Sequence, residues 1–348
     1  MFRSFLVYNK IMNISSIALS TIRHGQVFNT ASFFHFYFSL LTRGMYRSHN
    51  IHKHNRELVV TTLINNGAMH LLTTYWGAII QEFEAQRSVI TPKVNSNGEL
   101  WSRYGELPHK RYIIESLQNC YYLMVVFWNG SDIKNHVNLK KMYDNLGRFL
   151  LENLEKYLHP VSDVPNHPHF KIVKSFLGTL HNLFNKYGEC IDEMRALRGI
   201  EILSQYRNSG NVLIQVKSVL ASAYLLQDQD KENQDNAVFE LGEKDMKFMI
   251  TALEDAMKSE NYHSKTYGYN VEELITGINN IAAIDCNKGR LVDAGILPVY
   301  VRGMKALEPG IQKEAANGVW VLAFEEKNTK KIIEQPDLMN GMYIHCLL

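Results

Sequence analysis

Asparagine side chains on otherwise apolar stretches are the residues of this sequence whose chemistry most needs a reason. The segment GINNIAAIDCNKG, residues 277–289, sets Asn279 and Asn280 inside an apolar run. An amide offers one acceptor and two donors, which match the N–H and C=O of a peptide chain. On a helical wheel with about 100° per residue, Asn280 falls opposite the apolar stripe that contains Leu274, and Asn279 lies nearer the stripe's edge. We expect Asn280 to face a ligand and Asn279 to be structural; a solvated polar face or a helix cap is the alternative for Asn280.

The other clusters that could do chemistry lack the spacing that their chemistry requires. DQDKENQD, residues 228–235, has Asn233 and Phe239 where an EF-hand needs Gly and Glu. Histidines gather in 49–55 and 159–170 without fixed ligand spacing or nearby cysteines. The sequence contains no GxxxxGK[ST], GxGxxG, GxSxG or HExxH motif. We therefore expect no metal, no cofactor and no enzymatic activity.

The charge distribution separates the first part of the chain from the rest. Of 37 basic and 35 acidic residues in 348, seven basic ones and no acidic one lie in the first 56, which leaves 30 basic against 35 acidic. A mildly acidic body argues against nucleic acid as a partner, because phosphate contacts need a basic face. We expect residues 1–53 to be a basic extension, either poorly structured or a mitochondrial targeting signal. Its apolar run is shorter than the roughly 20 residues of a membrane span, so stable membrane insertion is not expected.

The cysteines indicate a reducing compartment. Cys120, Cys190, Cys286 and Cys346 lie far apart, with no CxxC pair. This spacing indicates neither a disulfide framework nor a zinc site. The expected location is cytoplasmic, with mitochondrial targeting by residues 1–50 as the alternative.

Internal repeats organise the rest of the sequence. Leu274–Val301 recurs as Ala315–Met342, so that Gly277 matches Gly318 at a spacing of 41 residues. VKSFLGTLHNL, residues 173–183, matches VKSVLASAYLL 43 residues later. SLQNC, residues 116–120, matches TLHNL after 63 residues, so that copy carries an insertion.

Each repeat is predicted to contain a short helix, a glycine-marked turn, a second helix, a connector and a third helix. A single repeat cannot bury its own apolar face, whereas stacked neighbours share a continuous core. We therefore expect an all-α solenoid over 54–348, with about five units and a truncated sixth. The third helices are predicted near 110–127, 169–186, 211–226, 270–283 and 312–325.

Three segments carry a resemblance to a known repeat family: Asn287–Tyr300, EAANGVWVLA at 314–323 and, near the start, NNGAMHLL at 65–72. Through them the chain resembles the armadillo-repeat family, with HEAT repeats as the close alternative. It covers the chain from about Asn55 onward, and its two C-terminal units match most specifically. It implies a right-handed superhelix of three-helix repeats whose third helices line a concave groove for extended peptides.

In importin-α and β-catenin, an asparagine on each third helix holds the main chain of the ligand. In this sequence Asn119, Asn182 and Asn280 match that column, whereas Leu225 and Val321 fill it in the other two units. The tryptophans of importin-α, four residues earlier, are replaced by Glu115, Gly178, Ala221, Thr276 and Asn317, which disfavours a nuclear-import receptor. The predicted peptide-binding groove consists of Asn119, Asn182, Asn280, Thr276, Asn317 and Trp320.

The resulting functional hypothesis is a non-enzymatic scaffold that binds an extended peptide or a partner protein in this groove. The alternative is a regulatory or autoinhibitory armadillo region of a larger signalling protein or enzyme, for example one with an NAD-linked TIR domain. The last unit stops inside its second helix, and an uncapped solenoid exposes apolar surface. That feature favours a fragment of a longer protein, or self-association through the C-terminal repeat.

Overall fold

The described part of the chain is all-α and divides into two compact units. The computed structural model describes residues 56–65, 67–89, 110–156, 168–226, 240–264, 266 and 268–339, so the predicted extension 1–53 lies outside it. We call Met1–Cys190 unit 1 and Ile191–Leu348 unit 2. Within the described ranges the sole β pairing is an isolated bridge between His263 and Asn270. The prediction of an all-α fold is confirmed for these residues.

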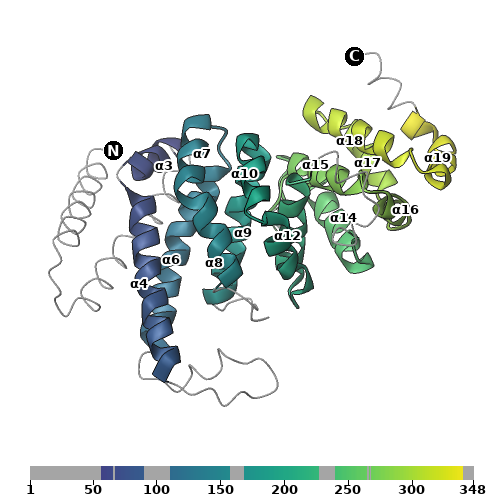
Figure 1. Ribbon diagram of the computed structural model, residues 1–348. Coiled ribbons are helices and arrows are strands. Elements are labelled where there is room, and N and C mark those ends of the chain that lie inside the picture. The colour runs from purple at the N-terminus through teal and green to yellow at the C-terminus, as the bar shows by residue number, and fades with distance from the viewer. Residues whose placement is uncertain are drawn as a thin grey trace. The chain divides into compact units, whose positions relative to one another are not determined.

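Unit 1 contains six described α-helices, which Figure 1 labels, and two short η segments. They are α3 (Arg56–Asn65), α4 (Ala68–Val89), α6 (Lys110–Ser131), α7 (His136–Met142), η3 (Tyr143–Gly147), α8 (Arg148–Lys156), α9 (Pro168–Lys186) and η4 (Gly188–Cys190). The segments α7, η3 and α8 follow one another without a break, so 136–156 is one helical run with a π turn at its centre. This run belongs to the insertion that the sequence predicts between the matching segments of α6 and α9.

Helices α6 and α9 run parallel and form the centre of unit 1. Their contacts advance in the same order along both helices, from Tyr121 with Lys171 to Asp132 with Lys186. Between these ends the two helices bury apolar side chains from both sides. The buried residues include Leu123, Met124, Phe127, Phe176, Leu180 and Phe184.

Unit 2 is built from shorter helices with a three-helix period. They are α10 (Ile191–Ala196), α11 (Gly199–Ser204), η5 (Gln205–Asn208), α12 (Val212–Tyr224), α14 (Glu243–Met257), α15 (Val271–Ala282), α16 (Asp285–Asp293), α17 (Leu297–Met304), α18 (Pro309–Leu322) and α19 (Glu326–Ile333). Helices α16, α17 and α18 make one complete repeat. By the same order α14 and α15 are the second and third helices of the repeat before it, and α19 is the first helix of the next.

The predicted glycine turn connects α16 to α17. Gly295 has φ +96°, which a residue without Cβ adopts at little cost, and the N–H of Ile296 donates to the C=O of Leu291 over 3.2 Å. Pro298 lies in the first turn of α17, where a missing N–H leaves no hydrogen bond unmade. The turn folds the second helix back on the first and sets the direction of the third.

A helix lies in each of the five ranges in which a third helix is predicted. Helices α6, α9, α12, α15 and α18 begin and end within four residues of the predicted limits. In unit 2 the helices surround one apolar core. Its fully buried members include Leu220, Leu253, Leu274, Ile278, Tyr300 and Val319.

Two buried asparagines give the repeat a recurring hydrogen bond. Asn287, at the start of α16, donates from Nδ2 to the C=O of Ile281 over 3.3 Å. Asn328, 41 residues later, donates in the same way to the C=O of Leu322 over 3.2 Å. Asn287 also accepts the N–H of Leu241 over 3.0 Å, so one amide joins the segment before α14, the end of α15 and α16. The equivalent bonds show that the sequence repeat is also a structural repeat.

Replacement of Asn287 by Ala should destabilise unit 2. The change leaves the buried N–H of Leu241 and the C=O of Ile281 without this partner, at a cost of about 1–3 kcal/mol in the free energy of unfolding. Urea denaturation followed by circular dichroism measures the loss. Asn280→Ala is the matched control, because Asn280 is half-buried, and it should change stability by less than about 0.5 kcal/mol. Equal stability of the two variants would contradict the junction role of Asn287.

Candidate functional site

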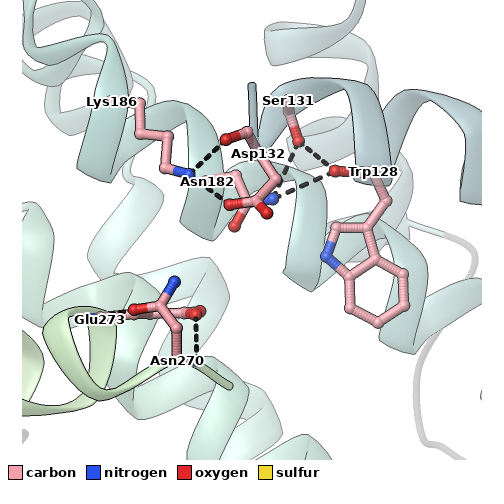
Figure 2. Close-up of polar contacts among 7 residues, drawn as sticks. All are labelled: Trp128, Ser131, Asp132, Asn182, Lys186, Asn270 and Glu273. Atoms are coloured by element: carbon pink, nitrogen blue, oxygen red, sulfur yellow. Dashed lines mark hydrogen bonds and ion pairs between the residues drawn. The ribbon is translucent and has the colours of Figure 1, made fainter. Parts of the chain in front are cut away.

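The helix that carries Thr276 and Asn280 begins at a reciprocal cap. Asn270 accepts the N–H of Glu273 on its side chain over 2.7 Å, and the Glu273 carboxylate accepts the N–H of Asn270 over 3.4 Å (Figure 2). This capping box fixes the start of α15. The start of α15 in turn fixes the direction in which its polar face points.

The predicted two faces of α15 are present. Leu274, Ile278 and Ile281 are fully buried, whereas Thr276 and Asn280, one turn apart, are half-buried. No side-chain hydrogen bond joins either of these two residues to another described residue. Their hydroxyl and amide groups are therefore available to a ligand.

Asn279 is buried and joins three helices. Its Nδ2 donates to the C=O of Glu314 over 2.8 Å and lies 3.3 Å from Oε2 of the same residue on α18. Its Oδ1 accepts the hydroxyl of Tyr300 on α17 over 2.7 Å, and Tyr300 is fully buried. Burial raises the pKa of the Tyr300 hydroxyl, which therefore stays a neutral donor. The Asn279 amide thus sets the spacing between α15 and α18.

A glycine on α18 makes room for this amide. A Cβ added at Gly318 would lie 2.5 Å from Oδ1 of Asn279 and 2.5 Å from the Tyr300 ring. Real Cβ atoms do not approach other heavy atoms so closely, so α18 packs against α15 because residue 318 has no side chain. The match between Gly277 and Gly318 in the sequence reflects this close approach, since Gly277 faces Leu220 of α12 in the same way.

Helix α18 presents amide and aromatic groups on the face that corresponds to Thr276 and Asn280. Asn317 is exposed and lies one repeat of 41 residues after Thr276. Trp320 is 56% exposed and Phe324 is 68% exposed, and their rings meet edge to face with centroids 5.5 Å apart. We call Thr276, Asn280, Asn317, Trp320 and Phe324 the α15–α18 face.

Phe324 was not among the residues predicted from the sequence. It follows Trp320 by four residues, so the two side chains lie on one side of the helix end. An aromatic pair at this spacing, beside exposed polar residues, was the available signal. Lys288 on α16 lies 5.8 Å from the centre of the Phe324 ring and pairs with Asp285 at 2.5 Å.

The two earlier asparagines of the predicted groove are buried in unit 1. The Nδ2 of Asn182 on α9 lies 3.1 Å from the C=O of Trp128 and 3.1 Å from the Ser131 hydroxyl, at the end of α6 (Figure 2). Beside it, Lys186 donates to the C=O and the carboxylate of Asp132. Asn119 is 1% exposed, and neither of its amide atoms has a hydrogen-bond partner among the described residues. The Asn182 amide therefore connects α9 to the end of α6.

The glycines explain why Asn182 and Asn280 differ. Gly178 on α9 and Gly277 on α15 each face the preceding third helix, where an added Cβ would lie 2.4 and 2.5 Å from a side chain. Alignment on these glycines places Asn182 level with Ile281, one position after Asn280. One residue turns a helical side chain by about 100°. The sequence alignment that put both asparagines in one column is therefore offset by one residue from the packing.

Other proposed chemistry has no support in the described residues. No three His, Cys, Asp or Glu side chains among them could hold a metal ion together. Residues 228–235 and the histidines of 49–55 lie outside the described ranges. Cys120 and Cys190 are buried and Cys286 is exposed, while Cys346 lies outside these ranges. No described helix is both long enough and apolar enough to cross a membrane.

Comparison with known proteins gives a likeness to designed armadillo repeats. A designed armadillo repeat protein is 15% identical over 81% of this chain and 93% of its own, with a TM-score of 0.40. Two engineered proteins from a structural genomics consortium are 16% and 15% identical, each with a TM-score of 0.36. The first covers 65% of this chain and 88% of its own length, and the second covers 84% of this chain and 66% of its own length. No family model and no curated protein matches the chain.

Replacement of Gly318 by Ala should separate α15 from α18. The new methyl group collides with Asn279 and Tyr300, so the buried hydrogen bond between them is disturbed, at a cost of about 1–3 kcal/mol in the free energy of unfolding. Gly310→Ala is the matched control on the same helix, since a Cβ there meets nothing within 4 Å. The control should be neutral or more stable by up to about 1 kcal/mol. Thermal denaturation measures the stability of both variants. An equal loss of stability in Gly318→Ala and Gly310→Ala would contradict close packing at Gly318.

Proposed function

We propose that this protein is a non-enzymatic interaction scaffold that binds an extended peptide segment of a partner protein on the α15–α18 face. One observation carries the proposal. Thr276 on α15 and Asn317 on α18 lie at repeat-equivalent positions, with Asn280 one turn further along α15 and the exposed Trp320–Phe324 pair further along α18, and none of these polar side chains is hydrogen-bonded to another described residue. Exposed groups of this kind on rigid, closely packed helices are suited to recognition.

Each group has a role that follows from its chemistry. The amides of Asn280 and Asn317 can each donate to a peptide C=O and accept a peptide N–H, and Thr276 adds a hydroxyl. Trp320 and Phe324 offer an L-shaped aromatic surface against which an apolar ligand side chain would pack. The buried Asn279 hub holds the two helices at a fixed distance, so the ligand does not have to order them.

The proposal covers part of the predicted groove. Asn119 and Asn182 were also predicted to line the groove, because they lie on third helices as well. Both side chains are buried in unit 1, so a ligand could contact them only after local opening of the helices, which costs free energy. We therefore assign the direct contacts to unit 2. The proposed setting is the cytoplasm, and the proposed partner is a polypeptide rather than a nucleic acid.

The test is a peptide selected on the purified protein from a random display library, with its affinity measured by fluorescence anisotropy. Trp320→Ala should weaken binding about 30-fold, because exposed aromatic anchors at interfaces contribute about 2 kcal/mol. Asn280→Ala with Asn317→Ala should weaken binding about tenfold, as expected for the loss of two hydrogen bonds of about 0.5–1.5 kcal/mol each.

Gln205→Ala with Asn261→Ala is the control, since it removes two exposed amides from unit 2, one on η5 and one in the turn after α14, and neither belongs to the α15–α18 face. This control should bind like the unmodified protein. A selected peptide whose affinity is the same for all variants would place the binding surface elsewhere. Failure to select any peptide would contradict the proposed scaffold function.

A further inference from the structure

Unit 1 carries a second surface of different chemistry, where α6 and α9 lie side by side. Two lysines of α9 lie over two aromatic rings of α6. The ammonium of Lys171 is 5.8 Å from the centre of the Tyr121 ring, and that of Lys174 is 5.9 Å from the centre of the Trp128 ring. We call these four residues the α6–α9 face.

The spacing of the four residues follows from the parallel packing of the helices. Tyr121 and Trp128 are seven residues apart, which is two helical turns, and both are half-buried. Lys171 and Lys174 are three residues apart and lie on one side of α9. Gly178, one turn further on, leaves room for the indole, since an added Cβ would lie 2.4 Å from Cε2 of Trp128. Trp128 thus lies close against α9, and Lys174 reaches over its ring.

Neither lysine has the carboxylate partner that Lys186, a further half-buried lysine of α9, has. Lys186 pairs with the carboxylate and the C=O of Asp132, whereas no carboxylate among the described residues lies within ion-pair distance of Lys171 or Lys174. Burial removes water from Lys174 and lowers its pKa below the ordinary value of a lysine. The ring face offsets part of this lost hydration, and an anion would offset the rest.

We propose that the α6–α9 face binds an acidic polypeptide segment, whose carboxylates pair with Lys171 and Lys174. Lys171 and Lys174 are three residues apart on α9, about one helical turn, which suits neighbouring acidic side chains of an extended or helical ligand. Each ammonium group already lies over an aromatic ring, so less side-chain entropy is lost on binding. This surface is independent of the α15–α18 face, because its residues lie on other helices and its ligand has a defined charge.

A polypeptide fits this face better than a nucleic acid does. Nucleic-acid affinity comes from many phosphate contacts distributed along a basic groove. Here two cations stand in a chain whose residues after position 56 carry 30 basic against 35 acidic groups. Two ammonium groups are sufficient for a pair of carboxylates but not for tracking a phosphate backbone.

The probe is a fluorescein-labelled oligoglutamate peptide, titrated with the full chain at low ionic strength and followed by anisotropy. Lys171→Gln with Lys174→Gln should weaken binding about tenfold or more, as expected for the loss of two charge pairs. Lys171→Arg with Lys174→Arg keeps both charges and should retain most of the affinity. Added salt should weaken binding of the unmodified protein and should have a smaller effect on the glutamine variant.

Lys134→Gln with Lys156→Gln is the charge-matched control, since it removes two positive charges from unit 1 outside the α6–α9 face. If this control weakened oligoglutamate binding as much as Lys171→Gln with Lys174→Gln, net charge alone would explain the loss of affinity and the proposal would be overturned. Absence of oligoglutamate binding to the unmodified protein would overturn it as well. A single-stranded oligonucleotide that binds more tightly, and is lost in the same glutamine variant, would replace the polypeptide by nucleic acid.

Trp128 supplies a local readout. Peptide binding should change the tryptophan emission, and Trp128→Phe should remove that change while Trp76, Trp101 and Trp320 remain. An unaltered emission change in Trp128→Phe would place the bound peptide elsewhere. Circular dichroism of each variant separates loss of binding from loss of fold.

Discussion

The buried amide of Asn279 is the interaction on which the proposed recognition surface of unit 2 depends. It accepts the Tyr300 hydroxyl and donates to Glu314, so three helices meet at one polar group. A buried amide that lost these partners would cost more than an apolar side chain in its place. Helices α15 and α18 therefore have one favourable spacing. Gly318 allows that spacing because it places no atom where Asn279 and Tyr300 meet.

Asparagine has two uses in this fold, and the difference is burial. Asn182, Asn287 and Asn328 are buried, and each donates to a backbone C=O near the end of a neighbouring helix. Asn280 and Asn317 lie at positions where the fold makes no use of the amide. The residues that we propose for ligand contact are those that the packing does not require. This division explains why two neighbouring asparagines, 279 and 280, have different roles.

The two proposed surfaces differ in how they obtain rigidity and specificity. The α15–α18 face presents neutral hydrogen-bonding groups and an exposed aromatic pair, held from beneath by a buried polar hub. The α6–α9 face presents two ammonium groups held over aromatic rings, with Trp128 placed by Gly178. The first suits the main chain of a ligand and the second suits acidic side chains. Both surfaces use a glycine to bring neighbouring third helices close together.

The sequence by itself determined the helical class, the ranges of the five third helices and the repeat from Gly277 to Gly318, because apolar periodicity and turn residues are local signals. It also separated Asn279 from Asn280, since both lie on one helix whose apolar stripe is visible. It could not determine the register between helices. A shift of one residue rotates a side chain by about 100°, enough to move an amide from the ligand face into a helix contact. The packing of Gly178 against the Trp128 ring, which only the tertiary structure shows, directs the Asn182 amide toward α6. The position of the Lys174 ammonium over the same ring is likewise visible only in the tertiary structure.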